Sequence, residues 1–227
     1  MDGSPIRQKT YAVNEEGQSI EADGVEITVY GAITGFYCSS RQLTKLDVSK
    51  NVALMDLVCS GNQLAKLDVS KNVALTNLNC NENQLEALDV SKNVALTNLV
   101  CGINLLAALD VRKNTALTDL ECRGNQLAAL DVSKNTALTY LECGNNQLAV
   151  LDVSKNTALG YLECSNSPTI TTLSVASAYG DASISTALAT LITDATSTTG
   201  TLNIYGGDNT TVHTAATTKG WTVNTNL

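Results

Sequence analysis

The sequence predicts a repeat solenoid of the α/β type, with mostly short parallel strands and few helices except near the C-terminus. The first observation behind this prediction is a strict repeat of 21 residues. The second is a two-residue alternation of apolar and polar positions within each repeat. The third is that the apolar residues of one repeat are too few to form a core alone, so consecutive repeats must stack to bury them.

Cysteine marks the repeat most clearly. Around each cysteine the pattern LxxLxCxxNxLxxLDVSKNxA recurs, and the turn that begins at Leu75 carries it unchanged. In its LxC segment, a period of two sends Leu78 and Cys80 to one face and their neighbours to the other, as in a half-buried strand. The LDV segment at Leu88–Val90 repeats this alternation half a turn later. The seven cysteines are Cys38, Cys59, Cys80, Cys101, Cys122, Cys143 and Cys164.

We expect one continuous domain with three parts. Residues 1–32 form an N-terminal cap that contains a strand at Val25–Tyr30, and residues 33–167 form seven 21-residue repeats. Residues 168–227 form longer strand-helix repeats that act as a C-terminal cap, because a solenoid must cover its terminal layers. A separate ligand-binding domain at 168–227 is the alternative.

Within the C-terminal part the apolar pattern changes from strand to helix and back. Residues 181–195 place several apolar side chains on one helical face, with Asp181 or Ser183 near the N-cap. A short helix is predicted at Thr211–Lys219, ended by Gly220. Strand positions in this part are Leu173, Val175, Leu202, Ile204, Trp221 and Val223, and the helical face of residues 181–195 comprises Ile184, Leu188, Leu191 and Ile192.

The regular spacing favours a structural role for the cysteines. Neighbouring parallel turns direct their Cβ atoms side by side, which suits the disulfide dihedral angle badly. CxxC and CxH spacings are absent, which disfavours a zinc site. Cysteine is a small apolar side chain that is often fully buried. We therefore expect a column of reduced, buried thiols; scattered disulfides and a metal site are the alternatives.

Two asparagine columns and one Asp-Lys column mark the bends. An asparagine at a bend can satisfy backbone groups that the turn leaves unpaired. We read the LDVSK segments as a solvated face in which lysines offset the stacked aspartates; a calcium column is the alternative, although the glycine-rich spacing of calcium-binding solenoids is missing. The asparagines are Asn62, Asn83, Asn104, Asn125 and Asn146 in one column, and Asn51, Asn72, Asn93, Asn114, Asn135 and Asn156 in the other.

The composition excludes several classes of partner. The formal net charge is −8, whereas nucleic acids and anionic lipid surfaces bind basic patches. The sequence contains no run of about 18 apolar residues, so we expect no membrane insertion. It also opens without the basic and then apolar segments of a signal peptide. We expect a monomer without a cofactor.

The LxxLxCxxNxL segment resembles the leucine-rich repeat consensus, with cysteine at one leucine position. The 21-residue length and the regular cysteines resemble the cysteine-ladder repeats of internalin J-like bacterial surface proteins. This resemblance covers residues 33–167 and departs from the pattern at Ile33, Phe36 and Arg41. It implies a right-handed horseshoe or gently curved solenoid at the cell surface or outside a bacterium. It also implies adhesion to, or recognition of, a protein or glycan on a host or neighbouring cell through the concave strand face.

Information for a ligand must lie at the variable outward positions that flank the core leucine and cysteine. In the last three repeats these positions combine tyrosine rings with carboxylates, which suits stacking on sugar rings or capture of a basic peptide. The candidate ligand-binding residues are Asp119, Glu121, Tyr140, Glu142, Tyr161 and Glu163. The alternative is that recent duplication copied these residues without selection for binding.

We expect no enzymatic activity. Glycosidases need two carboxyl groups about 5–9.5 Å apart across a pocket with separated pKa values, whereas an open strand face gives its carboxylates similar surroundings. His213 is the single histidine and accompanies no recognisable nucleophile motif. The sequence therefore favours a binding module, with a structural spacer in a larger surface protein second and a hydrolase third.

Overall fold

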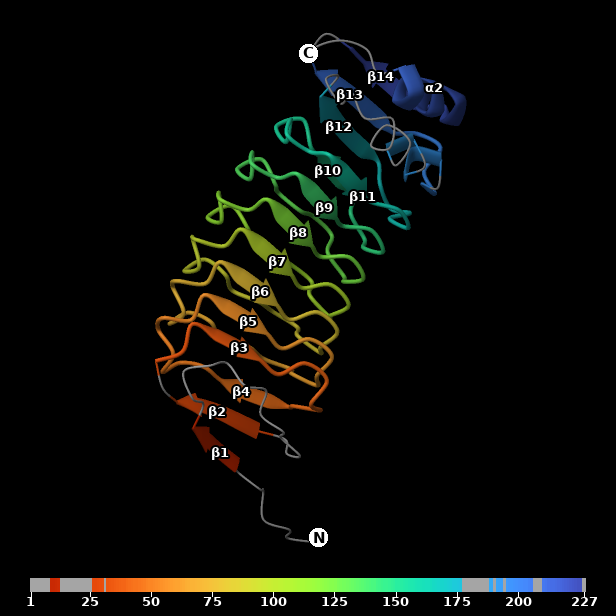
Figure 1. Ribbon diagram of the computed structural model, residues 1–227. Helices are drawn as coiled ribbons and strands as arrows, with labels where there is room; N and C mark the ends of the chain where they lie inside the picture. Colours follow the sequence, from red (N-terminus) through yellow and green to blue (C-terminus); the bar gives the residue numbers. More distant parts are fainter. Residues whose placement is uncertain are drawn as a thin grey trace, which may run out of the picture.

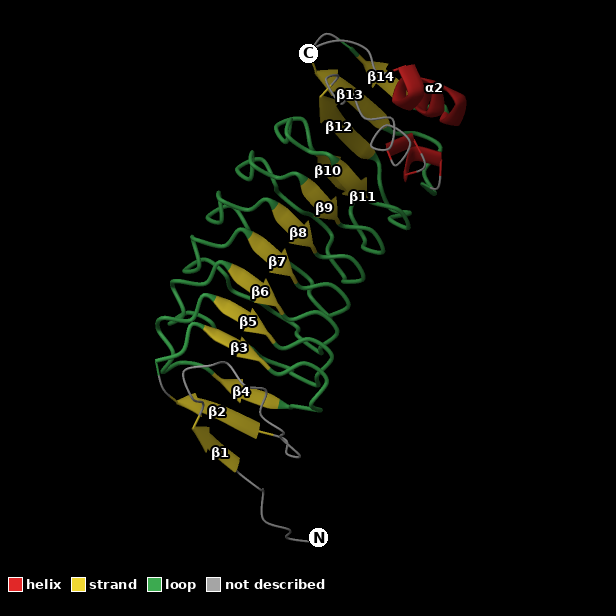
Figure 2. Cartoon of the chain, in the orientation of Figure 1, coloured by secondary structure: helices red, strands yellow, loops and turns green. Residues whose placement is uncertain are grey.

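The computed structural model describes residues 9–12, 26–30, 32–176, 188–189, 191–193, 195–205 and 210–225. These residues form an elongated stack of coils, with residues 9–12 at one end and residues 210–225 at the other (Figure 1). Strands follow one another along the stack, and helix is confined to its C-terminal end (Figure 2). The predicted solenoid architecture is confirmed.

The central element is a parallel sheet of seven three-residue strands, one from each repeat. Strands of consecutive repeats pair in register, so that Leu78 lies beside Leu57 on one side and Leu99 on the other. In the order of the sheet the strands are β11 (Tyr161–Glu163), β9 (Tyr140–Glu142), β8 (Asp119–Glu121), β7 (Asn98–Val100), β6 (Asn77–Asn79), β5 (Asp56–Val58) and β3 (Gly35–Tyr37).

The core consists of columns of identical side chains. Within each strand the middle leucine or phenylalanine is buried, and each of its two neighbours is partly exposed or exposed. The cysteine that follows the strand is buried in all seven repeats, and all seven side chains are thiols. In the first six repeats its backbone N–H donates to the carbonyl of the residue 20 positions later, as in the 2.8 Å bond from Cys80 to Val100. The expected cysteine ladder is confirmed.

The first asparagine column satisfies the backbone of the bends. Asn104 Oδ1 accepts the backbone N–H of Leu85 at 3.0 Å. Asn104 Nδ2 donates to the carbonyls of Cys80, Cys101 and Gly102 at 3.0–3.1 Å. Repeated in consecutive turns, this arrangement connects each bend to its neighbour, and the predicted asparagine ladder is confirmed.

The N-terminal strands pair with the opposite, LDV side of the solenoid. β1 (Lys9–Ala12) and β2 (Glu26–Tyr30) form a parallel three-stranded sheet with β4 (Lys45–Asp47) in the order β1-β2-β4. Lys45 also forms an ion pair with Glu26 of the neighbouring strand. The predicted strand is thus present over Glu26–Tyr30, and it pairs with the LDV side of the first repeat.

The C-terminal strands use the same side. β10 (Val150–Asp152), β12 (Thr172–Ala176), β13 (Thr201–Tyr205) and β14 (Thr222–Asn224) form a parallel sheet in that order. The alternation of the LDV segments does not by itself make them strands: among the described residues, this side of the repeat is a strand only in β4 and β10, where a cap strand supplies in-register backbone partners.

Helix α2 (Thr210–Lys219) lies against the last strands. Its buried Val212 and Ala216 face the core, and Gly220, with a φ of 86°, ends it in the left-handed conformation that favours glycine. Residues 188–189 and 191–193 are helical as predicted, whereas Asp181, Ser183 and Ile184 lie outside the described residues. No helix in the described part of the chain is long and apolar enough to cross a membrane.

Candidate ligand-binding face

The six candidate residues lie together at the C-terminal half of the seven-stranded sheet. Register pairs Tyr140 with Asp119 on one side and with Tyr161 on the other. The same register aligns Glu121, Glu142 and Glu163 in the second outward column. We call the surface made by Asp119, Glu121, Tyr140, Glu142, Tyr161 and Glu163 the acidic-tyrosine face. Strand alternation places all six outside the core, as the sequence predicts.

The two tyrosines form a stacked pair. Their ring centroids are 4.4 Å apart and their planes differ by 7°. The Tyr140 hydroxyl donates to a carboxylate oxygen of Glu142, and this bond is the main reason that the pKa of Tyr140 is raised. Tyr161 is 41% exposed. The stack therefore offers a fixed aromatic surface at low conformational cost to a ligand.

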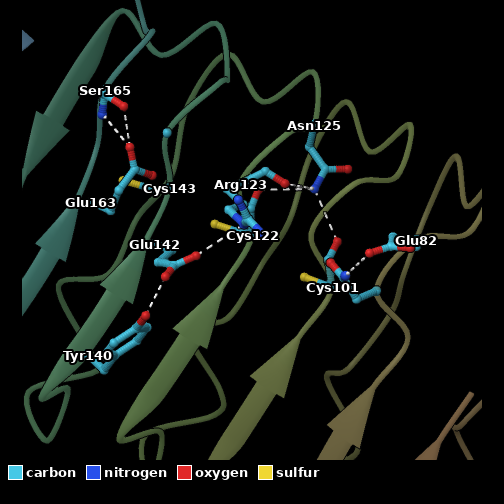
Figure 3. Close-up of polar contacts among 12 residues, drawn as sticks. Glu82, Cys101, Cys122, Arg123, Asn125, Tyr140, Glu142, Cys143, Glu163 and Ser165 are labelled. Atoms are coloured by element: carbon cyan, nitrogen blue, oxygen red, sulfur yellow. Dashed lines mark hydrogen bonds and ion pairs between the residues drawn. The ribbon is translucent and has the colours of Figure 1, made fainter. Parts of the chain in front are cut away.

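Glu142 is held from two sides. Besides the Tyr140 hydroxyl, Arg123 approaches it with Nε 3.2 Å from Oε2 (Figure 3). Only 14% of the Glu142 side chain is exposed, against 48% for that of Arg123. Sequence reasoning missed Arg123, although it stands in a column otherwise made of small side chains. That column comprises Ser39, Ser60, Asn81, Gly102, Gly144 and Ser165.

The Glu163 carboxylate packs directly against Gly144. Its Oε1 accepts the Ser165 hydroxyl and, at 3.1 Å, the Ser165 backbone N–H (Figure 3). A Cβ atom at Gly144 would overlap both carboxylate oxygens, so this placement requires glycine there. Among the described residues, Glu163 Oε2 is buried without a hydrogen-bond partner. A buried, unpaired carboxylate oxygen costs free energy that a donor group from a ligand or water recovers.

Glu121 completes the carboxylate column. Its pKa is raised, first by burial and then by the charge of Glu142, while Arg123 partly offsets the effect. The nearby Asp119 carboxylate accepts a 2.6 Å hydrogen bond from the Thr118 hydroxyl. A single arginine therefore lies among three aligned glutamates, and a further cationic group would be stabilised at this position.

The rest of the sheet face is less charged. Its middle positions are Val58, Asn77, Asn79, Asn98 and Val100. At the N-terminal edge Tyr37, which is 46% exposed, donates a 2.6 Å hydrogen bond to Asp56. Among the described residues, aromatic stacking is thus combined with a carboxylate column on β8, β9 and β11 alone.

The aspartates of the LDVSK segments shape turns on the opposite side of the molecule. Asp89 Oδ1 accepts the backbone N–H of Ser91 at 2.8 Å, and this hydrogen bond is the first cause of the lowered pKa of Asp89. Nearby lysines lower it further but contribute less. At Asp89 charge compensation is therefore secondary to turn formation, whereas Asp110 forms a 2.7 Å ion pair with Arg112. Among the described residues, no group of three or more His, Cys, Asp or Glu side chains is arranged to hold a metal ion.

Comparison with known proteins gives structural relatives. No protein-family model and no curated protein matches the sequence. The functional domain of InlJ from Listeria monocytogenes, which includes a cysteine ladder, is 34% identical to the chain, with a TM-score of 0.59. The match covers 70% of the chain and 39% of the InlJ domain, so the chain spans less than half of that relative.

A second solved structure supports the fold alone. InlF, an internalin from Listeria monocytogenes, is 17% identical with a TM-score of 0.51, and the match covers 88% of the chain and 56% of InlF. The 21-residue repeats, the buried thiol column and the asparagine ladder agree with the InlJ match. The chain is an InlJ-like leucine-rich repeat solenoid with a cysteine ladder.

Proposed function

We propose that the chain is a non-enzymatic recognition module that binds a protein or glycan through the acidic-tyrosine face. The observation that carries the proposal is the stacked Tyr140–Tyr161 pair beside three aligned glutamates. Buried aromatic anchors supply much of the energy of protein interfaces, and ring faces also stack on sugars. The similarity to the functional domain of InlJ supports this proposal and a position at the surface of, or outside, a bacterial cell.

The environment of the carboxylates argues against hydrolysis. A glycosidase needs one carboxyl group as acid and a second as base or nucleophile, both facing the substrate. Here Glu142 is occupied by Tyr140 and Arg123, and Glu163 accepts hydrogen bonds from Ser165. These contacts suit a fixed recognition surface better than proton transfer.

A screen against arrayed glycans and ectodomains of host cell-surface proteins tests the proposal. The protein is compared with a Tyr140→Ala/Tyr161→Ala variant, and Tyr37→Ala serves as the matched control because it removes an exposed tyrosine from the other end of the same sheet. We expect binding that the double variant loses and the control keeps. If the protein and both variants bind nothing, the chain acts as a spacer; turnover of any array component would support a hydrolase.

A further inference from the structure

The bend at Ile103 differs from the bends of the other repeats at a position where the backbone φ is positive. The residue two places after each cysteine has a positive φ in all seven repeats. At Ile103 the value is 49°, and this is the single β-branched side chain in the column. A β-branched residue at positive φ is strained, whereas glycine and asparagine tolerate it. The other residues of the column are Ser40, Gly61, Glu82, Gly124, Asn145 and Asn166.

The same bend carries a second apolar exception. Leu105 stands four places after its cysteine, where five of the other repeats have glutamine. Ile103 is 43% exposed and Leu105 is 44% exposed. The repeats act as internal references, since they show that this bend forms with small or polar residues at both places. The five glutamines are Gln42, Gln63, Gln84, Gln126 and Gln147.

The neighbouring turns leave this pair uncovered. On the C-terminal side lies Gly124, where an added Cβ atom would be 3.4 Å from Ile103 Cγ1, so only a glycine faces the isoleucine. On the N-terminal side lies the exposed Glu82, whose carboxylate accepts a 3.2 Å hydrogen bond from Asn81. Leu105 lies between the bends that carry Gln84 and Gln126.

We propose that Ile103 and Leu105 form a docking point for a protein partner that presents an aliphatic or aromatic side chain next to lysine or arginine. The proposal rests on the recognition role proposed above and adds a second contact region to it. Exposed apolar side chains rimmed by polar residues mark interaction sites, and local strain is retained where function requires it.

Charge identifies the kind of partner. Glu82 and Glu86 lie on the preceding turn, and the cationic side chain of the following turn, Arg123, is already paired with Glu142. The bend also adjoins the acidic-tyrosine face, because Ile103 N–H donates to the Arg123 carbonyl at 2.8 Å and Arg123 contacts Glu142. A basic partner complements this surface, whereas a second copy, with its own net charge of −8, would repel it.

Selection from a phage-displayed library of random 12-residue peptides tests the proposal without knowledge of the natural partner. Peptides are selected on the protein and then measured against Ile103→Asn/Leu105→Gln, which restores residues used by other repeats. We expect selected peptides with a large apolar residue beside Lys or Arg, at least about 10-fold weaker binding to the variant, and a variant Tm higher by about 2–4 °C because strain is relieved.

A variant that carries the isoleucine-leucine pair in another repeat provides the matched control. Adding Asn145→Ile/Gln147→Leu to that variant places the same two side chains two turns away, and we expect it not to restore peptide binding. Restoration would overturn the proposal, because any exposed apolar pair would then suffice. Unchanged binding to Ile103→Asn/Leu105→Gln, failure to select such peptides, or a dimer seen by sedimentation that this variant abolishes would overturn it as well.

The same peptides separate this proposal from the proposed function. Loss of binding in Tyr140→Ala/Tyr161→Ala, with Ile103→Asn/Leu105→Gln unaffected, would leave the acidic-tyrosine face as the site and remove the docking point. The opposite pattern would retain the docking point and remove the acidic-tyrosine face.

Discussion

At the scale of single residues, the two asparagine columns satisfy the backbone to different extents. Asn104 uses both ends of its amide, with one accepted and three donated hydrogen bonds. Asn114 donates to the carbonyls of Val90 and Asn93 at 3.0 and 2.8 Å. Its Oδ1 is buried without a partner among the described residues. The first column therefore stabilises the bends more than the second.

Alanine substitutions measure this difference. Asn104→Ala leaves a buried N–H and several carbonyls without the side-chain partner, so we expect a loss of about 3 kcal/mol or more in the free energy of unfolding. Asn114→Ala also removes a buried acceptor that has no partner, so we expect the free energy of unfolding to fall by about 1 kcal/mol less than in Asn104→Ala. Urea denaturation of both variants tests the order. Equal losses would show that the two columns contribute alike.

At the scale of elements, the sequence predicts the repeats better than the caps. A period of 21 residues and the LxC alternation suffice for the register of the seven strands, because every inward position repeats. The repeat period and the alternation do not determine whether a cap strand pairs with the LxC side or with the LDV side of the solenoid. The side depends on which strand offers its backbone N–H and C=O groups to the cap strand. Here β2 pairs with β4, and β12 pairs with β10, both on the LDV side.

The C-terminal cap is closed by a contact between a glycine and the single tryptophan of the chain. Trp221 is 4% exposed, and its indole N–H donates to the Ser197 carbonyl at 3.2 Å. A Cβ atom at Gly200 would overlap the indole ring. Periodicity cannot predict this contact, since it joins residues outside the regular repeats.

Gly200→Ala tests the importance of this contact. The added methyl group must displace the ring of Trp221, and we expect a loss of about 1–3 kcal/mol that is confined to the cap. Tryptophan fluorescence should then change at a lower urea concentration than the far-ultraviolet circular dichroism of the whole solenoid. If the fluorescence and circular dichroism transitions coincide, at the same urea concentration as in the unmodified protein, the prediction is contradicted.

At the scale of the whole molecule, the thiol column runs through the seven repeats. Burial raises the pKa of Cys38, Cys80 and Cys122 to about 12, and it raises the pKa of the remaining four thiols above the ordinary range. These side chains are therefore neutral, unreactive packing groups at neutral pH. Their position and burial follow from the sequence period alone. The contacts of the outward Arg123 side chain do not follow from this period, because they depend on which side chains of the adjacent turns lie close enough to meet it.

The thiol column also makes the fold sensitive to alkali. Thiols of the unfolded chain ionise near pH 8.5, while the folded thiols keep their protons to about pH 12, so the folded state binds more protons within this window. Stability is fully present below about pH 8.5 and falls as the pH rises, by about 1.4 kcal/mol per pH unit for each thiol.

Thermal unfolding at a series of pH values checks this dependence. We expect a Tm that is nearly constant from about pH 7 to 8 and that falls steeply above about pH 9, together with the appearance of thiolate absorbance at 240 nm on unfolding. A native protein whose thiolate absorbance rises near pH 9 would contradict the buried column.

In the proposed function, outward side chains on β8, β9 and β11 recognise a ligand, while the inward columns stabilise the fold. The most direct measurement is the dissociation constant of Tyr140→Ala/Tyr161→Ala for the array component that the unmodified protein binds most tightly. We expect the affinity to be about 100-fold weaker, with a Tm within about 2 °C of that of the unmodified protein. An affinity within about threefold of the original would contradict it.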